Sequence, residues 1–275
     1  YVVLAAALYA LGFSAILILG LSGALLFGQW WFSDTLSMKA MRAVEVTPEQ
    51  APQLHAVVDR LCAMADMPKP RVGIADSEAP NAFATGRSPN RSVVVVTTGL
   101  LRRLNRDELE GVLAHELSHV AHRDVTVMTV ASFTAILAGF MVRSAMWGSM
   151  MRGRRDQNTA LVFIGVMVVS VIVYFVSYLL INALSRYREL GADRGAALLT
   201  GKPSALASAL TKISGDMATI PTRDIRQMEA VSAFAFAPAV AGKREFTLEQ
   251  WFSTHPPLEK RLAQLASIAR ELGQR

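Results

Sequence analysis

Two histidines that flank a glutamate carry the clearest chemistry in this sequence. His115, Glu116 and His119 form the pattern His-Glu-x-x-His, with which helices bind zinc. Residues four apart share one face of a helix, so both imidazoles can bind one ion at about 2.0–2.1 Å. Glu116 then lies beside the ion, where its carboxylate can take a proton from a water molecule that the metal activates. The pattern also arises by chance, so its context must support it.

A catalytic zinc site needs a third protein ligand and an open position. His122 lies seven residues after His115, a climb of about 10.5 Å, which is too far for both to bind one ion from a straight helix. We therefore expect His122 to be a packing or helix-end residue. His55 lies on a helix that looks exposed, and His255 lies beside two prolines. A carboxylate from another helix is the better candidate.

Glu189 and Asp193 offer such carboxylates. They are four residues apart on a predicted helix, so one can bind the metal while the other accepts a hydrogen bond from an imidazole N–H. The alternative is a solvated helix face shared with Arg186, Arg188 and Arg194. A membrane hairpin between the two helices favours the metal site. Such a hairpin returns the chain to the side of the membrane that it left, which places the second helix beside the one with His115 and His119.

Helix signals surround both parts of this site. Asn105 and Glu108 form a predicted capping box, which starts a helix that runs from about Arg106 past His122. The second helix is predicted over residues 185–200 and ends at Gly201 and Pro203. Strands are predicted over 71–75 and 92–98, with a short strand or turn over 81–86, in a sheet of two or three strands. Further helices are predicted over 48–64, 204–217 and 257–272, and a loop over 220–247.

Three stretches of the chain carry no charge: residues 1–33, 125–142 and 157–185. A membrane-spanning helix needs about 20 mostly apolar residues. We therefore expect an N-terminal anchor with at least one span and a transmembrane hairpin. The net charge of +6 is explained by Lys and Arg that flank these spans, and no nucleic-acid motif accompanies it. The single cysteine, Cys62, is expected to be a small buried residue.

The sequence resembles the HtpX family of integral-membrane zinc endopeptidases, which are relatives of the CAAX prenyl endopeptidases. Four motifs in the same order carry the resemblance: LAHELSHVAHRD (113–124), SRYRELGAD (185–193), NAFATG (81–86) and STHPPL (253–258). The resemblance covers the chain from about Trp31 to its C-terminus. It implies a mainly α-helical membrane protein, with transmembrane helices and a zincin-type α+β catalytic domain that contains a small sheet.

The resemblance also assigns roles to individual residues. It implies one zinc per chain with Glu189 as the third ligand, and Asp193 as support behind a ligand. An edge strand that binds substrate would contain Asn81, Ala82, Phe83 and Ala84. His255 and Arg261 would stabilise the oxyanion; without the resemblance, they would be a turn histidine and a solvated helix residue.

Four regions are expected: an anchor (1–33), a first catalytic part with the sheet and the His-Glu-x-x-His helix (34–124), a transmembrane hairpin (125–184) and a second catalytic part (185–275). The expected function is hydrolysis of misfolded or damaged membrane proteins, with unfolded polypeptides as substrates, at the inner (cytoplasmic) membrane of a bacterial cell. Eight basic residues flank the spans on the catalytic side and four lie in the hairpin turn, which favours a multi-pass protein with its catalytic domain in the cytoplasm.

Two other functions are possible from the sequence. A membrane scaffold or adaptor would have a structural metal or none. Processing of lipidated CAAX peptides would need an enclosed chamber with many more spans than this chain provides.

Overall fold

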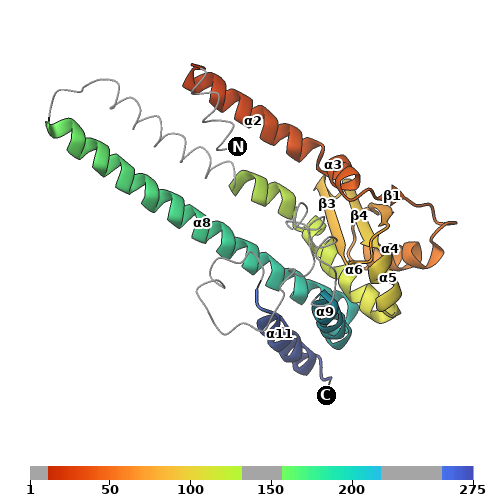
Figure 1. Cartoon of the computed structure of the whole chain (residues 1–275). Helices are drawn as coiled ribbons and strands as arrows, with labels where there is room; N and C mark the ends of the chain where they lie inside the picture. Colours follow the sequence, from red (N-terminus) through yellow and green to blue (C-terminus); the bar gives the residue numbers. More distant parts are fainter. Residues whose placement is uncertain (1–11, 132–156, 218–255, 275) are drawn as a thin grey trace. The chain divides into compact units, whose positions relative to one another are not determined.

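The computed structural model describes residues 12–131, 157–217 and 256–274 (Figure 1). The chain divides into two compact units, one of Tyr1–Trp30 and Val127–Leu184, the other of Trp31–Thr126 and Ser185–Arg275. The second unit contains every described candidate site residue. It is mainly helical with one small mixed sheet, as the sequence predicts. His255 and the predicted loop over 220–247 lie outside the described residues.

The sheet has four strands in the order β1-β2-β4-β3, rather than the two or three expected. Their bounds are β1 Val44–Glu45, β2 Arg71–Ala75, β3 Ala82–Ser88 and β4 Arg91–Thr97. β1 pairs antiparallel with β2, β2 parallel with β4, and β4 antiparallel with β3, so β3 lies at one edge. Within β3, the register shift between Gly86 and Ser88 needs a glycine, because the φ of Gly86 is +153° and a Cβ there would lie 2.1 Å from the carbonyl oxygen of Arg91.

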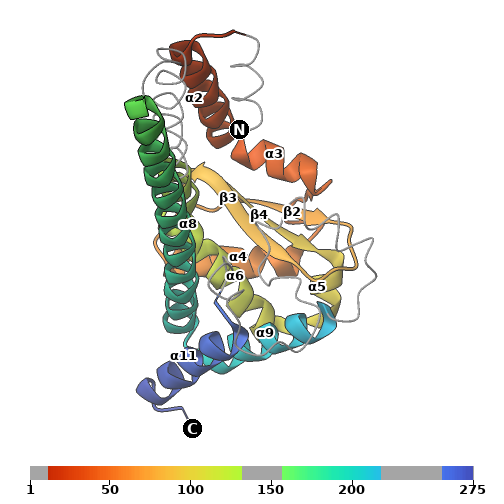
Figure 2. The ribbon, with the colours of Figure 1, turned by 60° about the vertical axis from the view of Figure 1, so that its left-hand side comes forward.

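The two faces of the sheet pack against different helices, because successive strand residues point to opposite sides. Phe83, Val93 and Val95 face a small cluster with Met38 and Met41, next to helix α3 (Ser33–Ala40). The alternate residues Ala82, Ala84, Val94 and Val96 belong to the main core, with helices α4 (Pro52–Met64) and α6 (Arg106–Ala121). Figure 2 shows the sheet between α3 on one side and α4 and α6 on the other.

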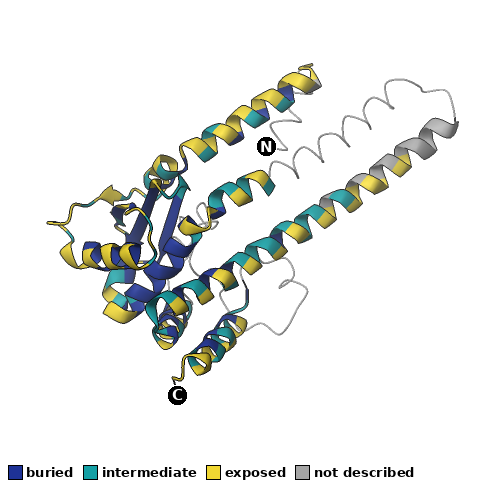
Figure 3. Cartoon of the chain, turned by 180° about the vertical axis from the view of Figure 1, so that it is seen from behind, coloured by how far each residue is buried: buried dark blue, intermediate teal, exposed yellow. Residues whose placement is uncertain are grey.

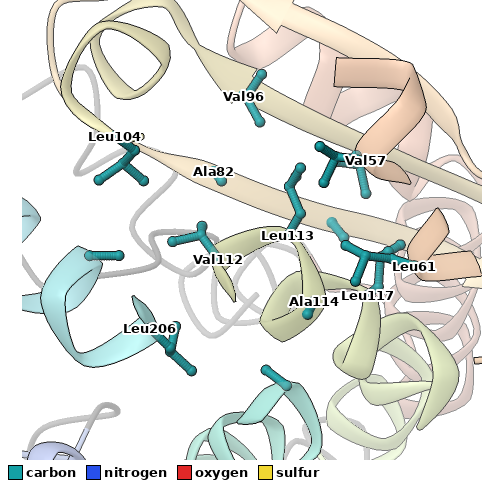
Figure 4. Packing of buried hydrophobic residues seen from close by; sticks show 14 of the residues in the cluster. Val57, Leu61, Ala82, Val96, Leu104, Val112, Leu113, Ala114, Leu117 and Leu206 are labelled. Carbon is teal, nitrogen blue, oxygen red and sulfur yellow. The ribbon is translucent and has the colours of Figure 1, made fainter. Parts of the chain in front are cut away.

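Helix α6 carries the histidine pair and is buried over almost all its length (Figure 3). Its capping box is present as predicted: Asn105 Oδ1 accepts from the Glu108 amide at 3.0 Å, and Glu108 Oε2 accepts from the Asn105 amide at 2.9 Å. Leu113 and Leu117 pack against Val57 and Leu61 of α4 (Figure 4). The sheet, α4 and α9 therefore hold this helix from several sides.

Helix α6 ends before His122, whereas the sequence predicts that it runs past this residue. It stops at Ala121 with His122 as its C-cap, and Arg123 adopts a φ of +55° before a new helix starts at Asp124. His122 is thus a helix-end residue, as predicted. The turn at His122 and Arg123 interrupts the helical backbone, so the two helices are separate elements.

The helix with Glu189 and Asp193 is the end of α8 (Gln157–Thr200), which stops before Gly201 with φ +65°. This helix passes close to α6 at Gly195, where a Cβ would lie 2.8 Å from Ser118 Oγ and would require the Ser118 side chain to move. Helices α9 (Pro203–Met217) and α11 (Leu258–Glu271) complete this unit and confirm two further predictions. A short helix not predicted from sequence, α5 (Thr98–Arg103), follows β4.

The other unit contains most of α2 (Ala15–Trp31) and the first part of α8. Within the described ranges, no helix by itself has the length and apolar composition of a membrane span. One bent pair, Ile16–Trp31 with Ser33–Ala40, meets those criteria jointly, with an angle of 74° between the helices.

Two expectations about single residues have different outcomes. Cys62 is buried, as predicted, and burial raises the pKa of its thiol to about 11. His55 was expected to be exposed, and this is wrong: it is 6% exposed, and its Nε2 lies 2.9 Å from the carbonyl oxygen of Val46. The segment before α4 folds back over this residue and shields it from water.

Candidate metal centre

The two histidines of α6 point toward the same location. Their Nε2 atoms are 3.1 Å apart, and the rings meet edge to face with centroids 4.7 Å apart. A spacing of four residues on a regular helix produces this convergence. The capping box and the burial of α6 stabilise this helix, and the helix in turn sets the distance between the two imidazole rings.

Glu189 brings a carboxylate from α8 to this pair. Its Oε1 lies 3.4 Å from His119 Nε2, and its Oε2 lies 3.7 Å from His115 Nε2. One donor atom from each of the three residues lies within 4.8 Å of the others. The structure therefore brings together the three residues that the sequence singles out as ligands.

The spacing and chemistry of these donors suit zinc. Ligands at the corners of a tetrahedron, about 2.0–2.1 Å from a zinc ion, lie about 3.3–3.4 Å from one another. The measured separations of 3.1, 3.4 and 3.7 Å lie around that value. Two imidazole nitrogens and one carboxylate oxygen leave the fourth position open, which is typical of catalytic zinc sites.

The charges around the donors also favour a divalent cation. Four buried carboxylates belong to this cluster, and two guanidinium groups face them among the described residues; the six residues are Glu116, Asp124, Glu189, Asp193, Arg188 and Arg261. The cluster therefore has two more acidic than basic groups. In the metal-free site, protons on Glu116 and His115, whose pKa values are raised to about 8 and about 9, balance this excess; a divalent ion that displaces both protons would balance it instead.

His115 is supported by Asp193, as the sequence predicts for one of the two carboxylates. Asp193 Oδ1 lies 2.9 Å from His115 Nδ1, so Nε2 faces the other donors. Asp193 is fully buried, which would raise its pKa, but hydrogen bonds from Arg261 and His115 hold that pKa below its usual range.

Arg261 holds Asp193 through two parallel hydrogen bonds of 2.7 Å, donated by its Nε and one terminal nitrogen. Its side chain is 2% exposed, so it is not a solvated helix residue. The other terminal nitrogen lies 3.8 Å from Glu189 Oε2. Its role at the oxyanion stays a prediction, as does that of His255.

Two residues of the site have no role in the sequence interpretation. Asp124 Oδ2 lies 2.6 Å from His119 Nδ1 and 2.9 Å from a terminal nitrogen of Arg188. On sequence alone, Arg188 belongs to the possible solvated face of its helix, whereas in the structure it reaches a buried carboxylate. The one sequence signal is the place of Asp124 within the motif 113–124 that carries the histidines.

Glu116 connects the histidine helix with the edge strand. The Ala84 amide donates to Glu116 Oε2 at 3.0 Å, on the side of β3 that faces away from β4. Burial raises the pKa of Glu116 to about 8, and the nearby Glu189 adds to this effect. Of the predicted strand residues, Ala82, Phe83 and Ala84 lie on β3, and Asn81 directly precedes it.

Zinc binding is expected to release roughly one to two protons per chain at pH 7. Burial alone would lower the pKa of His115, but hydrogen bonds to Asp193 and Glu189 raise it to about 9, so the metal-free residue is protonated. Glu116 is also mostly protonated below its pKa of about 8, whereas burial lowers the pKa of His119 and keeps it neutral. Affinity for zinc should therefore rise with pH and level off above about pH 9. Calorimetry in buffers of different ionisation enthalpy tests this, and an affinity independent of pH would contradict it.

Together, this fold and this donor set define a zinc metallopeptidase. Comparison with family models matches residues 48–269 to peptidase family M48. The chain is 59% identical to protease HtpX homolog 1 of Streptomyces coelicolor, over all of this chain and 90% of that protein. It is 54% identical to the protease HtpX homolog of Moorella thermoacetica, over 90% of this chain and 82% of that protein. The chain belongs to peptidase family M48, and within it to the HtpX proteases.

A solved structure shares the fold. The crystal structure of S. mikatae Ste24p matches with a TM-score of 0.62 and 16% sequence identity. The match covers 91% of this chain but 58% of that one. At this identity the likeness supports the fold alone.

Proposed function

We propose that this chain is a membrane-bound endopeptidase that holds one zinc ion with His115, His119 and Glu189. The observation that carries the proposal is the convergence of these three donors from two helices, with the carboxylate of Glu116 beside them. Bound zinc would supply positive charge that acidifies a water molecule and polarises the scissile carbonyl.

Glu116 performs the proton transfers in this proposal. Its carboxylate accepts a proton from the attacking water and later donates it to the leaving amine. The hydrogen bond from the Ala84 amide fixes the orientation of this carboxylate relative to β3. Asp193 and Asp124 hold the two imidazoles so that their Nε2 atoms face Glu189.

The substrate is proposed to bind along β3 as an additional strand. Among the described strands, β3 has a neighbour on only one side, which leaves its other edge for an extended peptide; the amide and carbonyl of Asn81 bond Thr97, and the Ala84 amide bonds Glu116. Pairing through main-chain hydrogen bonds makes little demand on sequence, which suits a protease for misfolded proteins. We also propose that Arg261, whose guanidinium lies near Glu189, stabilises the oxyanion together with His255.

The uncharged stretches support a place in the membrane. We propose an anchor in 1–33 and a hairpin in 125–184, with catalytic parts in 34–124 and 185–275 facing the cytoplasm of a bacterial cell. The distribution of basic residues supports this orientation. Damaged or misfolded membrane proteins would then reach the site near the lipid surface.

The function is tested with the full chain in detergent and β-casein as an unfolded substrate. One zinc per chain, cleavage that a chelator abolishes and recovery after zinc is added back are expected. A protein without cleavage at full zinc occupancy would instead be a scaffold with a structural metal. Cleavage that persists without metal would contradict the proposed chemistry.

A further inference from the structure

His119 has its own supporting carboxylate, separate from the one behind His115. Asp124 is 5% exposed and its Oδ2 lies 2.6 Å from His119 Nδ1. An imidazole that donates through Nδ1 carries its lone pair on Nε2. In His119 that Nε2 is the atom that faces His115 and Glu189.

The same carboxylate oxygen has a second partner from the other side of the apolar segment. A terminal nitrogen of Arg188 lies 2.9 Å from Asp124 Oδ2, and Arg188 directly precedes Glu189 on α8. The Arg188 side chain is 20% exposed, so solvent screens this pair only in part. Asp124 Oδ2 therefore contacts both the imidazole of His119 and the guanidinium of Arg188, the residue that directly precedes Glu189.

We propose that Asp124 is a positioning residue for the metal ligand His119, and that Arg188 acts through Asp124. The inference rests on the proposed function. Asp124 selects the tautomer of His119 and limits rotation of the ring, and Arg188 limits the movement of Asp124. Outer partners of this kind typically change metal affinity or activity by roughly 10- to 100-fold.

The arrangement repeats, with different residues, what the structure shows behind His115. There Asp193 contacts the imidazole and Arg261 holds Asp193. The support of His119 differs because its two members lie at positions 124 and 188, on either side of the segment 125–187. The orientation of the His119 ring therefore depends on the contact between Asp124 and Arg188, the residues that flank this segment.

The competing explanation is that Asp124 and Arg188 stabilise the turn after α6 and leave the metal unaffected. Zinc affinity separates the two explanations better than activity does. Asp124→Asn keeps the shape of the side chain but loses its charge. Asp107→Asn is a matched control, because Asp107, on the neighbouring helix α6, likewise pairs with a basic residue, Lys202, but is exposed.

Zinc affinity is measured by competition with a chelator in the full chain in detergent. We expect Asp124→Asn to weaken zinc binding roughly 10- to 100-fold and to change the visible absorption spectrum of the cobalt-substituted protein. Asp107→Asn should change neither. Arg188→Met should weaken binding in the wild-type background and add little to Asp124→Asn, because both act along one path.

Asp124→Glu covers the case in which Asp124→Asn does not fold. It keeps the negative charge for Arg188 but displaces the carboxylate from His119, so zinc binding should still weaken. Wild-type affinity and an unchanged cobalt spectrum in the folded Asp124 variant would overturn the inference, whatever its thermal stability. If the wild-type chain itself binds no zinc, the proposed function fails instead.

Discussion

Glu116→Gln is expected to abolish peptide cleavage while zinc and fold are retained. Glutamine has nearly the same shape, and its amide oxygen can still accept the hydrogen bond from Ala84. It cannot accept and return a proton, and loss of general acid–base catalysis alone typically costs about 10²- to 10⁴-fold in rate. Casein cleavage and bound zinc, measured on the same preparation, check this result.

The pKa of Glu116 makes a second readout possible. Because the folded pKa is raised to about 8, the buried carboxylate keeps its proton between pH 4.5 and about 8, whereas the carboxylate of the unfolded chain loses it, so the metal-free fold loses stability as pH rises through this range. Metal-free Glu116→Gln should therefore unfold at no lower temperature than the wild type at pH 8. This separates lost chemistry from lost structure.

Glu110→Gln is a matched control for this experiment. Glu110 is another buried glutamate of α6, but its carboxylate contacts Lys202 at 3.0 Å rather than the metal centre. The folded fraction of this variant should cleave casein at the wild-type rate. Cleavage by Glu116→Gln that a chelator still abolishes would show that another group is the base.

Glu189→Ala is expected to lose the metal itself. The substitution removes one of three donors and leaves two imidazoles, so zinc affinity should fall by more than the roughly 10- to 100-fold typical of an outer partner. The fold should survive, because Asp193 and Arg261 still link α8 with α11. Zinc content after dialysis, measured by atomic emission, checks the prediction.

Glu259→Ala on α11 is the control, since this glutamate is exposed and has no part in the site. It should retain zinc and activity. Full zinc occupancy in Glu189→Ala would show that the third donor lies elsewhere, and the ligand set proposed here would be wrong.

Local signals predicted the elements of the catalytic unit well. The capping box of Asn105 and Glu108 and the apolar repeat of α4 depend on neighbours in sequence, and both helices were found. β1 was missed because two exposed residues, Val44 and Glu45, form no pattern of their own. That strand exists through its pairing with β2, a contact between distant parts of the chain.

Burial of single polar residues was harder to predict. His55 sits beside the apolar stripe of α4, so its helix position alone suggests exposure. Its burial depends on the carbonyl of Val46 from the preceding segment. The pairing of Asp124 with Arg188 was likewise beyond sequence patterns, because 64 positions separate them and no periodicity relates the two.

The split of the ligand set between α6 and α8 has a consequence for biosynthesis. His119 and Glu189 are 70 positions apart, and Arg261 follows 72 positions later. At about 5–20 residues per second, a ribosome completes the histidine pair roughly 4–14 seconds before it adds the glutamate. A nascent chain therefore cannot assemble the full set of donors, or digest its neighbours, until the apolar segment between them has been synthesised.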